Sequence, residues 1–250
     1  MSGHVTVEDA GAVRTVRMNR PDKKNALTGA MYAAMADALD GANNHGEIRC
    51  TIIAGAPGAF SAGNDLVEFS EAAASGEGLA APVVRFLHAL ARSERPLVAA
   101  VQGLAVGVGT TMLLHCDHVI ASTDARFSTP FVNLGLVPEA ASSLLAPSLM
   151  GHRRAFELLV MGRPLDAAAA QACGLVNAVV PADQVEVKAM KAARHIAALP
   201  AEAVAVSRRL MRGSPDATAA RIDEEVRLFK ERLRSTEAQS AFNAFLNRKR

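Results

Sequence analysis

Aromatic residues are scarce in this sequence, which has nine Phe, one Tyr and no Trp among 250 residues. Proteins that bind single-stranded nucleic acid stack the bases on aromatic side chains, so this scarcity argues against such a surface. An excess of charge is also missing, because 27 Lys and Arg stand against 25 Asp and Glu. A balanced chain offers little attraction to a polyanion, and we expect no nucleic-acid partner.

Cysteine is equally sparse. Cys50, Cys116 and Cys173 are far apart and show neither metal-binding nor redox spacing, as is typical of reduced thiols in a cytosolic protein. No apolar run approaches the roughly 18 residues that a membrane span needs. The N-terminus, MSGHVTVEDAG, resembles neither a signal peptide nor a transit peptide. These absences predict a cytoplasmic protein without a membrane partner.

Apolar residues make up 50% of the chain, enough for a sizeable core in one large domain or in a domain with an appendage. Hydrophobic periodicity predicts strands at 4–7, 12–18, 50–54, 97–101, 117–121 and 175–180. It predicts helices at 29–42, 83–91, 151–161, 167–173, 183–198, 201–212, 216–233 and 236–247. Alternating strands and helices favour an α/β fold with parallel crossovers. We expect a core over 1–199 and a helical region over 200–250.

The most informative stretch begins at Leu97. The apolar run Leu97–Val101 predicts a strand buried on both faces. Gly103, Gly107 and Gly109 then mark a turn in which Val108 begins a helix. The first N–H groups of a helix have no intrahelical partner and carry the positive end of its dipole. This pattern predicts an anion hole at the start of that helix.

Two further stretches complete the candidate site. The small residues of 59–66 (AFSAGNDL) predict a second strand-to-helix turn around Gly63. Farther along, Pro138-Glu139 places a carboxylate among small and apolar residues. An anion hole together with an isolated acid is what the removal of a proton next to a carbonyl requires. A simpler interpretation of Glu139 is a helix N-terminal acid that interacts with the dipole.

Four motifs in order resemble the crotonase (enoyl-CoA hydratase/isomerase) superfamily over nearly the whole chain. They are Arg20-Pro21 through Asn25-Ala26-Leu27, the turn Ala59–Leu66, the turn Gly103–Gly109, and Leu165-Asp166 through Cys173-Gly174-Leu175-Val176-Asn177. The resemblance implies a repeated ββα superhelix with a helical C-terminal trimerisation region. It also implies a homotrimer or a dimer of trimers, a role in fatty acid β-oxidation, and no cofactor, since coenzyme A is part of the substrate.

By position, the resemblance makes the backbone N–H groups of Asn64 and Val108 the two oxyanion donors. Val108 stands where the family usually has the middle of three glycines. The donor is a main-chain amide, so we expect the change to be tolerated. The same comparison assigns binding of the acyl-CoA to Lys24, Asn25, Ala26, Leu27, Ala62, Gly63, Asn64, Asp65, Leu66, Gly107 and Val108.

Two departures bear on the reaction. Hydratases of this family carry glutamates at the positions that are Thr111 and Phe131 here, and neither residue can act as acid or base on a water. Glu139, in Leu136-Val137-Pro138-Glu139, matches the single glutamate of the Δ3,Δ2-enoyl-CoA isomerase branch. The resemblance thus implies that Glu139 shuttles a proton to convert a 3-enoyl-CoA to a trans-2-enoyl-CoA. We expect its apolar neighbours to raise its pKa.

Alternatives remain at the level of sequence. The chain could be a 2-enoyl-CoA hydratase, another crotonase-fold enzyme acting on acyl-CoA, or a non-catalytic relative that binds acyl-CoA or RNA. Asp65 fits a helix cap better than a catalyst. His115 and His118 lack a third ligand, so we expect no metal. Lys23, Lys24 and Arg248–Arg250 could meet CoA phosphates or simply be solvated.

Overall fold

The computed structural model describes residues 3–65, 67–70 and 78–247 and contains two β-sheets. The larger sheet has six strands in the order β1-β2-β3-β5-β7-β10. They are β1 (Val5–Ala10), β2 (Val13–Met18), β3 (Cys50–Gly55), β5 (Leu97–Val101), β7 (His118–Ser122) and β10 (Ala178–Val180). The smaller sheet, in the order β4-β6-β8-β9, consists of β4 (Ala59–Ser61), β6 (Leu104–Val106), β8 (Arg126–Ser128) and β9 (Leu165–Asp166).

From β3 to β8, consecutive strands alternate between the two sheets. β3, β5 and β7 belong to the large sheet, and each is followed at once by a strand of the small sheet, β4, β6 or β8. A helical segment follows each pair: α3 (Ala81–Ala91) after β4, α4 (Val108–Thr111) with η2 (Met112–His115) after β6, and η3 (Val132–Leu134) with α5 (Ser142–Met150) and α6 (His152–Leu159) after β8. This ββα repeat confirms the predicted fold class.

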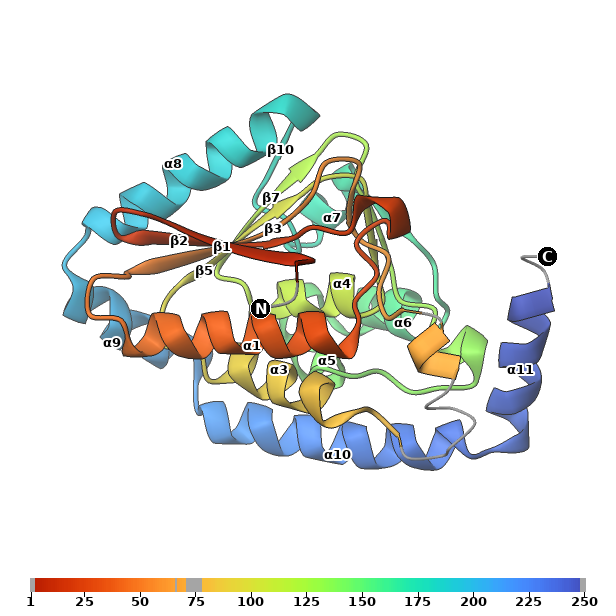
Figure 1. Cartoon of the computed structure of the whole chain (residues 1–250). Helices are drawn as coiled ribbons and strands as arrows, with labels where there is room; N and C mark the ends of the chain where they lie inside the picture. Colours follow the sequence, from red (N-terminus) through yellow and green to blue (C-terminus); the bar gives the residue numbers. More distant parts are fainter. Residues whose placement is uncertain (1–2, 66, 71–77, 248–250) are drawn as a thin grey trace.

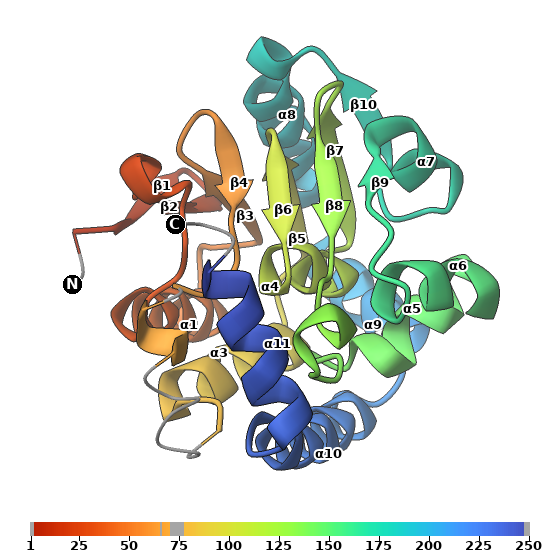
Figure 2. The ribbon, with the colours of Figure 1, turned by 90° about the vertical axis from the view of Figure 1, so that its right-hand side faces the viewer.

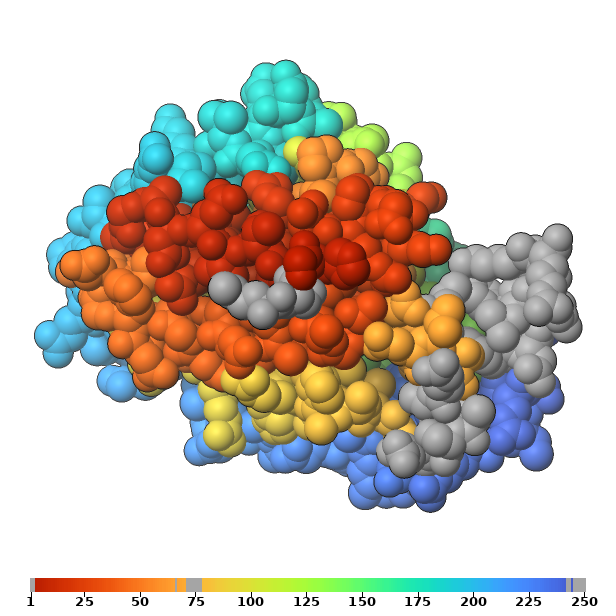
Figure 3. Space-filling model, viewed as in Figure 1, coloured from red at the N-terminus to blue at the C-terminus, as the bar shows by residue number. Residues whose placement is uncertain are grey.

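The large sheet is covered on both faces because its central strands are apolar throughout. In β3, Ile52 faces the cluster beneath α8 (Val185–Ala198), while Ile53 belongs to the main core on the opposite side. Side chains alternate between the two faces of a strand. Figure 1 shows α8 along one side of the sheet, with α1 (Gly29–Asn44), α3 and α10 (Pro215–Leu233) stacked on the other. Figure 3 shows the N-terminal hairpin and α1 at the surface of this view.

The C-terminal region consists of α9 (Ala201–Arg212), α10 and α11 (Thr236–Asn247). α10 packs along α3, and α11 turns away from α10 to pack against η3, as Figure 2 shows from the side of the small sheet. Phe229 and Leu233 on α10 are buried in an apolar cluster of the chain itself. The tail therefore shares a core with the segment that contains Phe131 and Leu136, although the side chains of Phe242, Phe245 and Leu246 lie outside the described residues.

Several predicted boundaries differ from the structure. Thr28 caps α1 as its position indicates, with its Oγ1 accepting from the Met31 N–H at 3.3 Å. α5 was not predicted, because it contains Pro147 and shows no helical periodicity. The last predicted strand, 175–180, is shorter in the structure, where β10 spans Ala178–Val180. The predicted helix 167–173 is present as α7 (Ala167–Ala172), capped by Asp166. None of the described helices is both long and apolar enough to cross a membrane.

Candidate active site

The first glycine turn follows β4 and pairs with the segment before α1. The Leu27 N–H donates to the Gly63 carbonyl at 2.8 Å, and the Asp65 N–H donates to the Leu27 carbonyl at 2.9 Å. In a parallel bridge with this pattern, the residue between the two bonded ones directs its N–H away from the partner strand. The N–H of Asn64 therefore faces the side on which β6 pairs with β4.

The second glycine turn follows β6 and opens α4. Gly107 has φ +56° and ψ −121°, a conformation open to glycine but not to residues with a Cβ. Its carbonyl accepts from the N–H groups of Thr110 and Thr111, at 2.8 and 3.0 Å. Val108 is the first residue of the helix, and a donor at this position has no acceptor within its own helix.

The two turns are in direct contact. A Cβ added at Gly63 would lie 2.8 Å from the carbonyl oxygen of Val106, and one added at Gly109 would lie 3.0 Å from Ser61. Gly63, which also has a positive φ, therefore requires glycine, and at Gly109 a Cβ would be a tight contact. The structure thus brings the turns that carry Asn64 and Val108 to one place, as the sequence predicts.

Glu139 lies next to the second turn and is buried, with 3% of its surface exposed. Thr111, one turn along from Val108, donates its hydroxyl to Glu139 Oε1 at 2.5 Å. Burial raises the pKa of Glu139 to about 8, the Thr111 hydrogen bond opposes this rise, and the charge of Glu225 adds to it. The expected upward shift is confirmed. A carboxylate with this pKa is an effective base near neutral pH.

Tyr32 is hydrogen-bonded to the first turn and lies within electrostatic range of Glu139, and sequence analysis missed it. Its hydroxyl donates to Asn64 Oδ1 at 2.5 Å, and the residue is 1% exposed. Burial raises the pKa of Tyr32 well above its ordinary value, and the charges of Glu139 and Glu68 add to the shift. The available signal was composition, since Tyr32 is the one tyrosine in the sequence.

The loop expected to bind the nucleotide packs against the first turn. Lys24 is exposed, and its carbonyl accepts from the Ala62 N–H at 2.9 Å. Asn25 is fully buried, and its side-chain amide donates to the carbonyls of Ala56 and Ala59. Leu27 is 1% exposed. The side chains of Asn25 and Leu27 therefore hold the loop together, while Lys24 and the half-buried Ala26 face outward.

Asp65 has the structural role that its sequence context favours. Its carboxylate pairs with Arg20 at 2.6 Å and accepts from the N–H groups of Val67 and Glu68. Burial opposes ionisation, yet the hydrogen bonds from Arg20, Glu68 and Val67 hold the pKa of Asp65 below its usual value. Leu66, also predicted to be in the site, lies outside the described residues.

His115, considered as a metal ligand on sequence grounds, instead supports the acid. Its Nε2 lies 2.7 Å from the Ala140 carbonyl, and burial lowers its pKa to about 4. A neutral ring with Nε2 protonated therefore donates to that carbonyl. Among the described residues, no cluster of three His, Cys, Asp or Glu side chains could hold a metal ion.

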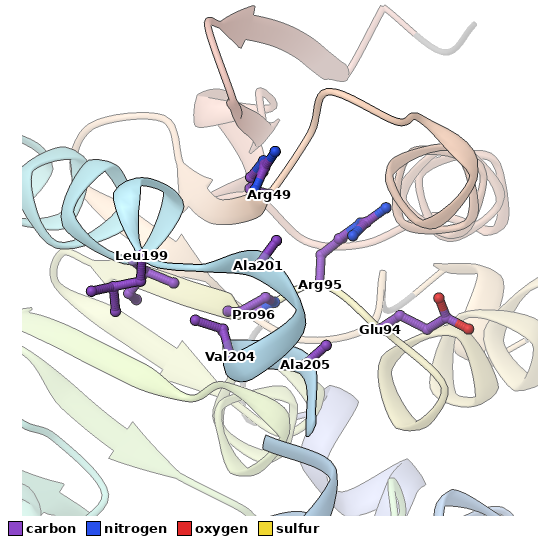
Figure 4. Close-up of a pocket in the computed structure, with 9 residues that line it drawn as sticks. Arg49, Glu94, Arg95, Pro96, Leu199, Ala201, Val204 and Ala205 are labelled. Atoms are coloured by element: carbon purple, nitrogen blue, oxygen red, sulfur yellow. The ribbon is translucent and has the colours of Figure 1, made fainter. Parts of the chain in front are cut away.

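A separate pocket lies at the amino ends of β3 and β5, beside α9. Figure 4 shows Arg49, Glu94 and Arg95 around it, with apolar side chains from the Leu199–Ala205 segment on the other wall. Its lining includes none of the predicted site residues. This pocket is therefore separate from the candidate site at the glycine turns and Glu139.

Comparison with known proteins agrees with this geometry. A family model described as enoyl-CoA hydratase/isomerase matches residues 8–250. Enoyl-CoA delta isomerase 2 of Rattus norvegicus is 36% identical over 250 residues, covering 98% of this chain and 64% of that protein. A probable enoyl-CoA hydratase of Rhizobium meliloti (strain 1021) is 30% identical over 98% of this chain and 95% of its own length.

A solved structure gives the same result for the fold. The crystal structure of an enoyl-CoA hydratase/isomerase from Pseudoalteromonas atlantica T6c is 41% identical and superposes with a TM-score of 0.92. The match covers 98% of this chain and 97% of that one. The chain spans less than two thirds of the rat relative but nearly all of the two bacterial proteins. It therefore belongs to the enoyl-CoA hydratase/isomerase family, within the crotonase superfamily.

Proposed function

We propose that this protein isomerises a 3-enoyl-CoA to the trans-2-enoyl-CoA, with Glu139 as its single acid–base residue. One observation carries the proposal: a buried carboxylate with a pKa of about 8 lies beside the two turns that present the amides of Asn64 and Val108. Its similarity to the rat enoyl-CoA delta isomerase 2 supports the same reaction.

The chemistry needs only one proton carrier. Glu139 removes a proton from C2 of the substrate, and the electron pair of that C–H bond spreads over the thioester oxygen and C4 as a dienolate. The amides of Asn64 and Val108 stabilise the oxygen, each contributing roughly 3–4 kcal/mol by analogy with other oxyanion holes. The protonated Glu139 then returns the proton to C4, so the double bond moves into conjugation with no net gain or loss of atoms.

The residues around Glu139 favour isomerisation over hydration. Thr111 occupies one position at which hydratases carry a glutamate, and it donates a hydrogen bond to Glu139 rather than activating a water. Phe131 occupies the other and is buried in an apolar cluster. A single carboxylate suffices to shuttle a proton between two carbons, whereas addition of water across a double bond is served by two.

The acyl chain would meet an apolar wall. Val83, Phe86 and Leu87 are buried in the main core and are not available to line a chain site. Phe69 and Leu79 are partly buried against the cluster that contains Phe131 and Phe229. We therefore assign the chain-contacting surface to Phe69 and Leu79.

We also propose that the protein assembles as a homotrimer or a dimer of trimers. Leu210 and Met211 on α9 are 78% and 87% exposed in the isolated chain. Exposed apolar side chains side by side on one helix are typical of a protein–protein contact. Phe229 and Leu233, in contrast, are already buried within the chain, so they are not available for a contact between subunits.

The direct test is to compare turnover of a 3-enoyl-CoA and a 2-enoyl-CoA by purified protein. Isomerisation is followed by the absorbance of the conjugated product, and hydration of the 2-enoyl-CoA by the loss of that absorbance. We expect rapid isomerisation and little hydration. Faster hydration than isomerisation would make the protein a hydratase, and no turnover of either thioester would favour a binding role.

A further inference from the structure

The backbone immediately after Glu139 is strained. Ala140 and Ala141 have φ values of +64° and +53°, and both are completely buried. A residue other than glycine in the left-handed region is energetically unfavourable and persists only where its surroundings hold it there. Two such residues in succession, directly behind the acid, need substantial support from neighbouring elements.

Part of that support comes from Glu225 on α10, more than eighty residues farther along the chain. Its Oε1 accepts from the Ser143 N–H at 3.0 Å and from the Ser143 hydroxyl at 2.5 Å. Arg221, one turn earlier on α10, donates to the Ser143 hydroxyl at 3.2 Å. Glu225 is only 4% exposed, so these contacts are shielded from water.

His115 holds the same turn from the opposite side. Its Nε2 donates to the Ala140 carbonyl at 2.7 Å, and its ring is 1% exposed. The turn is therefore held at Ala140 by η2, and just beyond it at Ser143 by α10. Any shift of either support would move the backbone from which the Glu139 side chain projects.

We infer that Glu225 is a positioning residue for Glu139, which it holds in place through the strained turn at Ala140 and Ala141. The inference rests on the proposed role of Glu139 as the base. Helix α10, in the C-terminal region, would then help to position the catalytic carboxylate, although Glu225 does not touch the reacting atoms.

The charge of Glu225 adds an electrostatic effect to this support. The titratable groups around the turn are Tyr32 on α1, His115 on η2, and Arg221 with Glu225 on α10. Burial raises the pKa of Glu139, and the like charge of Glu225 raises it further. Burial raises the pKa of Glu225 as well, while its hydrogen bonds and Arg221 oppose that rise. Two coupled carboxyl groups share their titration steps, so changing one must move the other.

The variant Glu225→Gln separates these effects, because its amide oxygen can still accept from Ser143 while the negative charge is gone. The direct readout is carbon-13 NMR of protein labelled at the glutamate carboxyl carbons, with the Glu139 resonance identified by its absence from Glu139→Gln. We expect its midpoint to fall by about half a unit or more in Glu225→Gln. The matched control is Glu231→Gln, a side chain on the same helix that is 58% exposed, and it should leave the midpoint unchanged.

Kinetics provide the second readout. Glu225→Ala removes the acceptor as well as the charge, so it should lower the plateau value of kcat by about tenfold or more with little change in KM, because catalysis is sensitive to small displacements. Ser143→Ala, which removes one of the anchoring hydrogen bonds, should lower kcat to a smaller extent. A folded Glu225→Ala with normal kcat, in which Glu139 titrates as in Glu225→Gln, would overturn the inference.

These outcomes are distinct from a failure of the proposed reaction. If the wild type does not isomerise 3-enoyl-CoA but the Glu139 carboxyl resonance is displaced further in Glu225→Ala than in Glu225→Gln, the proposed function is wrong and the positioning role stands. If isomerisation is observed but neither the Glu139 midpoint nor kcat changes in the Glu225 variants, the proposed function stands and the positioning role is wrong.

Discussion

Thr111 donates its hydroxyl to Glu139 Oε1 across 2.5 Å, so the residue that replaces a hydratase glutamate is in contact with the one carboxylate proposed to act. The bond stabilises the ionised form and holds the pKa of Glu139 below the value that burial alone would give. The threonine therefore has an active part in setting the strength of the base.

Replacing this threonine should weaken ionisation of the acid. Thr111→Val keeps the shape of the side chain and removes the donor, so the pKa of Glu139 should rise and the acid limb of the pH–rate profile should move to higher pH. Thr111→Ser retains a hydroxyl and is the control, with a profile close to wild type. An acid limb in Thr111→Val at or below the wild-type position would contradict the assignment.

The wild-type pH–rate profile is itself a prediction. Only the ionised carboxylate can accept the C2 proton, and the pKa of Glu139 is raised to about 8. Thus kcat/KM for isomerisation should increase with pH and level off above about pH 8. A rate that is independent of pH between 6 and 9 would mean that a different group acts as the base.

Removal of the base should abolish most of the activity. Glu139→Gln preserves the shape of the side chain but cannot take up the proton, and isomerisation should fall by at least about 10²–10⁴. Affinity for CoA products should survive, because the turns and the loop at Lys24 are unchanged. Near-normal turnover by a folded variant would move the chemistry to another group.

The same variant makes a prediction about stability. The folded-state pKa of Glu139 lies above its unfolded value of 4.5, so its contribution to stability is fully present below about pH 4.5 and is lost as pH rises through 8. The loss amounts to roughly 4–5 kcal/mol at most. Thermal unfolding from pH 5 to 9 should show a flatter curve for Glu139→Gln than for wild type, and parallel curves would argue against the raised pKa.

The amide of Val108 can be tested without a change of charge. Val108→Pro deletes the N–H at the first helical position, where proline is tolerated, and should reduce kcat by about 10²–10³. Val108→Gly keeps the N–H and should retain most of the activity, with some loss of stability because the Val108 side chain is 2% exposed. Full activity in a folded proline variant would exclude this donor.

The proposed assembly predicts a mass of three or six times 26.2 kDa by light scattering. Met211→Glu places a charge on the exposed apolar surface of α9 and should shift the protein toward monomer. Val187→Glu, at a position on α8 that is 68% exposed, serves as the control and should leave the mass unchanged. A monodisperse wild-type monomer at micromolar concentration would refute the proposal.

Local sequence signals predicted much of this fold, because they depend on near neighbours. Thr28 and Asp166 cap helices where a side-chain oxygen precedes an apolar repeat, and the central strand Leu97–Val101 has the predicted bounds. The short strands of the small sheet lack a repeat of their own. They form through pairing with distant strands, so no local pattern could reveal β6 or β9.

The candidate site divides in the same way. The glycine turns were predictable because close packing demands glycine at Gly63 and leaves little space for a Cβ at Gly109. The contributions of Tyr32 and Glu225 were not, since each depends on a contact made across the fold, to Asn64 and to Ser143. A tyrosine or a glutamate within a helix has no local feature that distinguishes such a role from ordinary burial or solvation.

The contact between the two glycine turns has an evolutionary consequence. Both proposed oxyanion donors are main-chain amides, and the turns that carry them pack closely against each other at Gly63 and Gly109. Substitutions of surrounding side chains can therefore alter the acid or its partners without removing the two proposed oxyanion donors. Proteins with this fold could therefore change their reaction through a few substitutions at positions such as Thr111, Phe131 and Glu139. The proposed oxyanion hole for the thioester would be kept.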